Sequence, residues 1–195
     1  MIFERGHFKA SRIVNLNESI RETRTFSKSK TEYKPNVFIS HKHSDLEDQK
    51  EVKGILEIFE NLGAKVYIDS MDNKMPEETS GETALRIKEV IKYTKKFVLV
   101  ATEKAIESYW CNWELGIGDT YKYIDNIAII PIKEKGEFDS QYKGNEYLQI
   151  YPTISYNKAF TNIKGHYFKE GYYVEKPKSK GGTIYITELT EWLKQ

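Results

Sequence analysis

The stretch NVFISHKHSD, residues 36–45, joins a short run of β-forming residues to a polar segment. The NVFIS part has the apolarity of a strand buried in a parallel sheet. The overlapping stretch SDLE, residues 44–47, matches a capping box in which Ser44 and Glu47 would begin a helix. A strand that leads directly into a helix predicts the first unit of an α/β fold.

The alternation of strand and helix continues along the next hundred residues. The first helical pattern ends at Gly63, and a second one follows a possible capping box formed by Thr79 and Glu82. An aromatic helix extends to about Tyr123. Further strands are predicted at KVYID, FVLVA and IAIIPI. This order implies right-handed βαβ units and a parallel sheet covered by helices on both faces.

The two ends of the chain differ from this central region. Residues 1–35 contain eight Lys and Arg against four Glu, a net charge of +4, which leaves about −3 for the remainder of a chain with net charge +1. We therefore expect a basic N-terminal arm over residues 1–34 that is weakly ordered or forms a short helix. Residues 35–195 would form one domain, with its core at 35–133 and a C-terminal elaboration at 134–195.

The C-terminal elaboration reads as extended segments followed by a short helix. The stretch YYVEKPKSKGGTIYI predicts a hairpin that turns at Ser179 to Gly182. The closing stretch TELTEWLKQ predicts a helix with Thr187 as a possible N-cap.

Composition limits the cellular setting and the partners. A chain of 195 residues with 39% apolar and 13% aromatic residues suits one globular domain. Thirty basic against 29 acidic residues give no sign of a nucleic-acid footprint or of attraction to a membrane surface. No apolar run is long enough to span a bilayer, and the single cysteine fits a reducing compartment. We expect a soluble, cytoplasmic protein without nucleic-acid or membrane partners.

Glu114 is the most informative candidate for a functional residue. In an open α/β sheet, ligands bind outside the carboxyl ends of the strands, and the aromatic helix begins near that edge. Trp110, Glu114, Ile117 and Tyr121 fall near one meridian of a helix, so Glu114 should face the core or a cleft. A carboxylate there costs stability unless a function or a partner compensates.

Several other chemistries lack their motifs in this sequence. There is no GxxxxGK[ST] phosphate loop and no nucleophile elbow of a Ser/His/Asp hydrolase. The stretch GIGDTY begins like a dinucleotide fingerprint but lies within a predicted helix. His41 and His43 have metal-ligand spacing, yet no third ligand lies near them in sequence, so we predict a polar loop and no metal.

The ordered series NVFISHKHSD, GAKVYID, KKFVLVAT, Trp110 four residues before Glu114, and IAIIPI resembles a bacterial TIR (Toll/interleukin-1 receptor) domain over about residues 35–133. The tail resembles the C-terminal part of some stand-alone bacterial TIR proteins. The resemblance implies a flavodoxin-like, three-layer αβα fold. Its five-stranded parallel sheet would have the order 2-1-3-4-5 and would be followed by a C-terminal β-hairpin and helix.

The resemblance also implies a function. Many bacterial TIR domains cleave NAD⁺ at the nicotinamide–ribose bond, using a helix glutamate that follows a tryptophan by four residues, as Glu114 follows Trp110. NAD⁺ would then be the substrate of an NADase or cyclase, with no cofactor. The product would be ADP-ribose or a cyclic ADP-ribose isomer, which a separate effector would sense in Thoeris-like antiphage defence. The alternative is a non-catalytic scaffold that acts through TIR–TIR contacts, and self-association is expected in either case.

Other candidate site residues come from the same resemblance. Ser40, His41 and Lys42 end the first strand, where family members contact ribose and phosphates, although a solvated loop would explain them equally well. The remaining candidates are Asp69, Met71, Lys74 and Trp113. Asp69 heads the loop that gates the site in the family, and Met71 and Lys74 lie in that loop. Trp113 fits core packing as well as substrate contact, whereas Cys111 fits packing.

A single carboxylate suits this reaction chemically. Glycosidases generally need an acid to protonate the departing oxygen. The nicotinamide of NAD⁺ is a cationic pyridinium that departs as a neutral molecule, so it needs no such acid. Positive charge then develops on the ribose, where one fixed carboxylate can stabilise it. Trp110 could hold the pyridinium by stacking or cation–π attraction.

Overall fold

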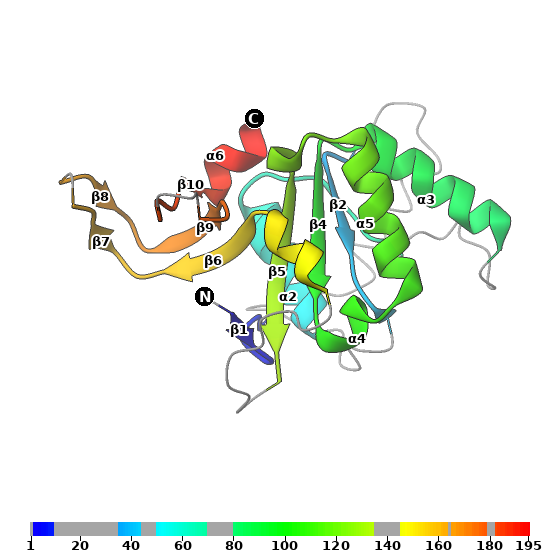
Figure 1. Cartoon of the computed structure of the whole chain (residues 1–195), viewed down its shortest axis with the longest axis horizontal. Coiled ribbons are helices and arrows are strands. Elements are labelled where there is room, and N and C mark those ends of the chain that lie inside the picture. Colours follow the sequence, from blue (N-terminus) through cyan, green and yellow to red (C-terminus); the bar gives the residue numbers. More distant parts are fainter. Residues whose placement is uncertain are drawn as a thin grey trace.

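The computed structural model of the chain describes residues 2–9, 35–43, 50–69, 80–134, 145–163, 165–178 and 182–195. A central twisted sheet runs through the molecule, and helices cover both of its faces (Figure 1). The mixed α/β architecture with a largely parallel centre confirms the fold class expected from the sequence.

The parallel strands of the sheet have the expected order. They are β2 (Val37–Ser40), β3 (Val66–Tyr67), β4 (Lys96–Ala101), β5 (Ile127–Lys133) and β6 (Thr153–Asn157). Their spatial order β3-β2-β4-β5-β6 is the predicted 2-1-3-4-5. The register places Phe38 opposite Phe97 and Leu99 opposite Ile129. Beyond β6, strands β9 (Gly171–Glu175) and β10 (Ile186–Glu188) extend the sheet in antiparallel fashion.

The strands at the centre are buried on both faces, as their unbroken apolarity requires. Alternate residues of each strand enter different cores. One core contains Val37 and Ile39 and lies against α2 (Lys50–Asn61) and α6 (Leu189–Lys194). The opposite core contains Phe38 and lies against α3 (Gly81–Tyr93), α4 (Glu103–Ile106) and α5 (Tyr109–Tyr121). Two short 3-10 helices, η3 (Ile124–Asn126) and η4 (Glu146–Ile150), flank β5 in sequence.

Helix boundaries follow the local chemistry, with small shifts from the predicted positions. Gly63 ends the turn after α2 with a φ of 82°, a conformation that glycine adopts without strain. The predicted cap of α3 was wrong by one residue, because Ser80 is the N-cap and forms a capping box with Thr83. The side chain of Ser108 caps α5 by accepting a hydrogen bond from the amide of Cys111. The N-cap of α6 is Glu188 rather than Thr187.

The first residues of the chain pack onto the domain. Strand β1 (Phe3–Glu4) pairs in parallel with the end of β5, where Phe3 lies opposite Ile132. The side chains of Phe3 and Phe8 are buried in the core that contains α2. Residues 2–9 therefore differ from the weakly ordered arm expected from the sequence, because apolar side chains anchor them. The rest of that arm, residues 10–34, lies outside the described residues.

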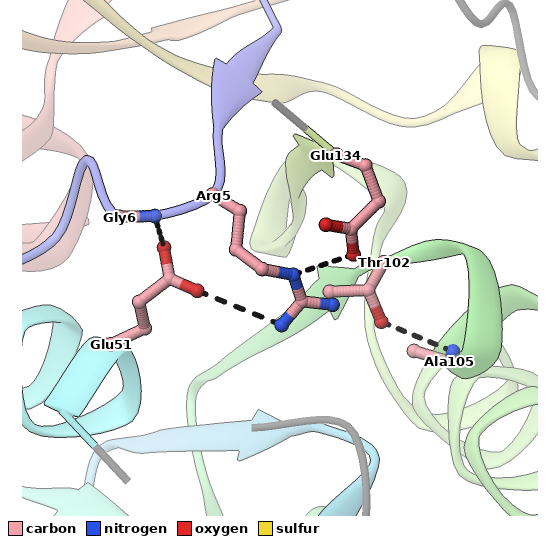
Figure 2. A network of polar contacts seen from close by, with 6 residues as sticks. All are labelled: Arg5, Gly6, Glu51, Thr102, Ala105 and Glu134. Atoms are coloured by element: carbon pink, nitrogen blue, oxygen red, sulfur yellow. Dashed lines mark hydrogen bonds and ion pairs between the residues drawn. The ribbon is translucent and has the colours of Figure 1, made fainter. Parts of the chain in front are cut away.

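A polar network fixes this N-terminal segment between α2 and the end of β5 (Figure 2). A carboxylate oxygen of Glu51 accepts a hydrogen bond from the amide of Gly6, and the other lies 3.8 Å from the guanidinium of Arg5. The Nε of Arg5 donates to Glu134 at 2.7 Å. The strand is thus tied to both of the elements that it bridges.

The C-terminal elaboration forms the far edge of the sheet and an arm. Strands β9 and β10 are antiparallel neighbours, as the predicted hairpin requires, although its turn at residues 179–181 lies outside the described residues. Strands β7 (Phe160–Thr161) and β8 (Tyr167–Phe168) form a separate ribbon that projects from the body (Figure 1). No helix in the described ranges has the length and apolarity that crossing a membrane requires.

Candidate active site

The site is assembled where β2 ends beneath α5. Ser40, the last residue of β2, is 1% exposed, and Glu114 in the middle of α5 is 2% exposed. The Ser40 hydroxyl donates a hydrogen bond to Oε2 of Glu114. Two residues 74 positions apart in sequence are therefore in direct contact at the carboxyl end of a central strand. This is the edge where α/β sheets bind ligands.

A glycine allows α5 to lie close enough for this contact. A Cβ placed on Gly118 would be 3.1 Å from the ring of Phe97 on β4, which is tighter than an ordinary van der Waals contact. Gly118 belongs to the GIGDTY stretch, and its position within α5 agrees with the rejection of a dinucleotide fingerprint. The glycine serves close packing between helix and sheet.

Burial makes Glu114 an unusual acid. Desolvation by burial, with a smaller contribution from the negative charge of Asp69, raises its pKa to about 8. The Ser40 hydroxyl and the Trp110 indole act in the opposite direction, because they stabilise the ionised form. Among the described residues, Oε1 of Glu114 is buried without a hydrogen-bond partner. The site thus presents one oxygen fixed by the protein and one oxygen with unused hydrogen-bonding capacity.

Two tryptophans lie beside this carboxylate on α5. The rings of Trp110 and Trp113 have centroids 5.0 Å apart and are inclined at 37°. Trp110 is half-buried, whereas Trp113 is 36% exposed and so does not belong to the core. The expectation that Tyr121 faces inward was wrong, because this side chain is 43% exposed. It is the last residue of α5, and Gly118 makes the close contact with the sheet one turn earlier.

The thiol of Cys111 faces the core behind the site. It is 1% exposed, and burial raises its pKa to about 11. A thiol with such a pKa stays protonated at neutral pH, so it lacks the thiolate that a nucleophile requires. This agrees with the packing role expected from the sequence.

A second polar cluster lies at the tips of β2 and β3. The Nε2 of His43 is 2.9 Å from Oδ1 of Asp69, and this contact raises the pKa of His43. His41 is 7% exposed, and burial lowers its pKa to about 4. The rings of His41 and His43 have centroids 4.8 Å apart. Asp69 lies far from the two histidines in sequence and comes close to them through the pairing of neighbouring strands, so the local sequence does not show it as their partner.

Of the other predicted site residues, the structure describes Lys42 and Asp69 but not Met71 and Lys74. Lys42 is half-buried beside the two histidines in sequence. Asp69 lies close enough to influence the pKa of Glu114, so it connects the second cluster to the first. Met71 and Lys74 lie outside the described residues. The structure therefore places Ser40 and Trp110 around the carboxylate of Glu114. The cluster of His41, His43 and Asp69 lies next to this group.

Comparisons with known proteins identify the family of the chain. A family model described as TIR domain matches residues 37–162, more than half of the chain. The "Probable 3' cyclic ADP-D-ribose synthase ThsB'" of Bacillus cereus (strain MSX-D12) is 32% identical over 122 residues, which cover 62% of this chain and 60% of that protein. The "Putative cyclic ADP-D-ribose synthase TIR2" of Cytobacillus dafuensis is 32% identical over 83 residues, 41% of this chain and 21% of that protein.

The chain thus spans less than two thirds of the length of either relative. Among solved structures, the TIR domain of the Toll-related receptor TRR-2 of Hydra magnipapillata matches with a TM-score of 0.40 and 19% identity. That match covers 57% of this chain and 78% of the receptor domain. The family model extends from the first residue of β2 through the parallel sheet to β7, and so includes Ser40, Asp69 and Glu114. The chain belongs to the TIR domain family.

Proposed function

We propose that this chain cleaves NAD⁺ at the nicotinamide–ribose bond, with Glu114 as the catalytic residue. The observation that carries the proposal is a carboxylate 2% exposed, held by Ser40 through one oxygen and without a partner for the other among the described residues. A buried acid with unused hydrogen-bonding capacity costs stability, and such groups concentrate at functional sites. A ribose hydroxyl of bound NAD⁺ is a suitable partner for Oε1.

The bond change needs only one carboxylate. The C1′–N bond breaks, its electron pair stays on the pyridine nitrogen, and nicotinamide leaves as a neutral molecule. The positive charge that remains on the ribose is stabilised by ionised Glu114, whose position Ser40 fixes before the reaction. Trp110 supplies an aromatic wall on the same helix, on which the cationic pyridinium can stack before it departs.

The fate of the ribosyl cation determines the product. Attack by water gives ADP-ribose and releases a proton, whereas attack by another group of the same molecule gives a cyclic isomer. Both relatives carry names that describe them as cyclic ADP-D-ribose synthases, which favours the cyclic product for this chain. We further propose that this product is a signal in antiphage defence, sensed by a separate effector protein.

Residues around the carboxylate would bind the rest of the substrate. His41 and Lys42 follow Ser40 at the end of β2 and would contact the ribose and phosphates. Asp69, Met71 and Lys74, which follow β3 in sequence, would also contact the substrate. Trp113, whose ring lies beside that of Trp110, would do the same. We propose that self-association of the chain accompanies activity, since a neighbouring copy can complete a site at an exposed edge.

An assembly role without catalysis is the second candidate. The observation that favours it is the exposure of large aromatic side chains at the start of α5 and shortly after its end, where Tyr109 is 95% exposed and Tyr123 is 85% exposed. Aromatic side chains are common anchors of protein interfaces. Under this hypothesis, Tyr109→Ala would abolish assembly, and Glu114→Ala would leave assembly unchanged.

The two candidates are separated by incubating the purified chain with NAD⁺ over a series of protein concentrations and resolving the products by chromatography. Release of nicotinamide that depends on Glu114 supports the enzyme. Absence of nicotinamide at every concentration, including with a crowding agent, would leave the assembly role as the better account.

A further inference from the structure

We propose that His41, His43 and Asp69 form a binding site for a divalent transition-metal ion, with Zn²⁺ as the best fit. The three side chains each offer one ligand atom, and these atoms all lie within 4.8 Å of one another. This inference goes beyond the cleavage of NAD⁺ and does not depend on it. It also revises the expectation of a plain polar loop, because the strand pairing supplies the third ligand that the local sequence lacks.

The geometry is close to that of a bound ion. Tetrahedral Zn²⁺ has bonds of about 2.0–2.2 Å to imidazole nitrogen and carboxylate oxygen, so neighbouring ligand atoms lie about 3.4 Å apart. One pair, His43 Nε2 and Asp69 Oδ1, is already 2.9 Å apart. Small rotations of the side chains would bring the set around one ion, which would replace the hydrogen bond between His43 and Asp69.

The surroundings of the ligands also favour an ion. His41 is 7% exposed, and its Nδ1 is buried without a hydrogen-bond partner in the part of the chain that the structure describes. A buried polar atom left without a partner costs stability, and coordination of a metal by the imidazole ring is one way to offset this cost. The side chain of Asp69 is 11% exposed, whereas that of His43 is 55% exposed and offers a route of entry.

The donor set selects the class of metal. Two imidazoles with one carboxylate suit Zn²⁺ and the neighbouring first-row ions, whereas Mg²⁺ and Ca²⁺ prefer sites made only of oxygen. Three protein ligands leave one tetrahedral position for water or another small ligand. Because the ligands come from the ends of β2 and β3, a bound ion would link the tips of two neighbouring strands beside Ser40.

Binding can be measured on the untagged chain, freed of metal with a chelator and then titrated with Zn²⁺ by calorimetry in the absence of NAD⁺. We expect one ion per chain, and a loss of affinity of at least tenfold in His43→Ala and in Asp69→Asn. His166→Ala is the matched control, because this exposed histidine lies by the β7–β8 ribbon. The affinity of this variant for Zn²⁺ should equal that of the wild type. Equal affinity in all four proteins, or no binding to the wild type, would overturn the proposal.

Thermal unfolding supplies a second readout that is independent of enzyme activity. An ion that binds only the folded chain raises the unfolding temperature, so Zn²⁺ should stabilise the wild type and His166→Ala but not His43→Ala. Circular dichroism without metal checks that His43→Ala is folded. A folded His43→Ala variant that Zn²⁺ stabilises as much as the wild type contradicts the assignment of the ligands. Both measurements are made without NAD⁺, so they test the metal site separately from the proposed catalysis by Glu114.

Discussion

The hydroxyl of Ser40 at the end of β2 donates a hydrogen bond to the buried carboxylate of Glu114 on α5. This contact fixes the acid at the ligand-binding edge of the sheet and stabilises its ionised form. It joins the two features on which the proposed chemistry depends, the position of the carboxylate and its charge.

Ser40→Ala should lower kcat for NAD⁺ cleavage by roughly ten- to hundredfold, because a hydrogen bond to a charged group contributes about 1.5–3 kcal/mol. The pH–rate profile should move to higher pH, since loss of the donor raises the pKa of Glu114 further. Ser155→Ala is the control: Ser155 is also buried and also donates to a glutamate, but it lies on β6, three strands from β2. If the pH–rate profile of Ser40→Ala were the same as that of the wild type, the positioning role of Ser40 would be contradicted.

The activity of the wild type should increase with pH. The catalytic form is ionised Glu114, and burial raises the pKa of this group to about 8 in the substrate-free chain. A plot of kcat/KM against pH reports the free enzyme, so its acidic limb should rise through about pH 8. A limb near the ordinary value of 4.5 would show that the carboxylate is solvated in the active form.

Glu114→Gln should stabilise the chain, and the gain should grow with pH. The folded state holds the proton up to about pH 8, whereas the unfolded chain loses it near 4.5, so the stability of the wild type falls between these values. The substitution removes this loss, and we expect a gain of roughly 2–4 kcal/mol at pH 8 and little change at pH 4. Urea unfolding at the two pH values measures the difference. A gain of equal size at both would point to another cause.

Two glycine substitutions test the docking of the N-terminal segment. A Cβ on Gly54 would lie 2.7 Å from the backbone carbon of Phe8, so Gly54→Ala should displace residues 2–9 and cost about 1–3 kcal/mol. Gly81 at the start of α3 has open space around it, and Gly81→Ala should be neutral or stabilise by up to about 1 kcal/mol. Denaturant midpoints compare the two variants. Similar midpoints would mean that the segment does not pack against α2.

The order of strands and helices could be predicted because each element has its own hydrophobic pattern. The family resemblance rested on the same elements, and the comparison with TIR domains confirmed it. Strand β1 could not be predicted, since two residues show no periodicity and its partner β5 lies more than 120 positions away. The contact of His43 with Asp69 also depends on tertiary pairing rather than on local sequence. The burial of Glu114 was predictable, because Glu114 lies on one helical meridian with aromatic and apolar residues.

The central claim is that Glu114 carries the cleavage of NAD⁺. The most direct measurement is the release of nicotinamide from NAD⁺ by the wild type and by Glu114→Gln at matched high protein concentration, with circular dichroism to confirm folding. We predict that the wild type releases nicotinamide and that the folded variant releases it at least a hundredfold more slowly. Equal rates in the two proteins, or no release by the wild type at any concentration, would contradict the account.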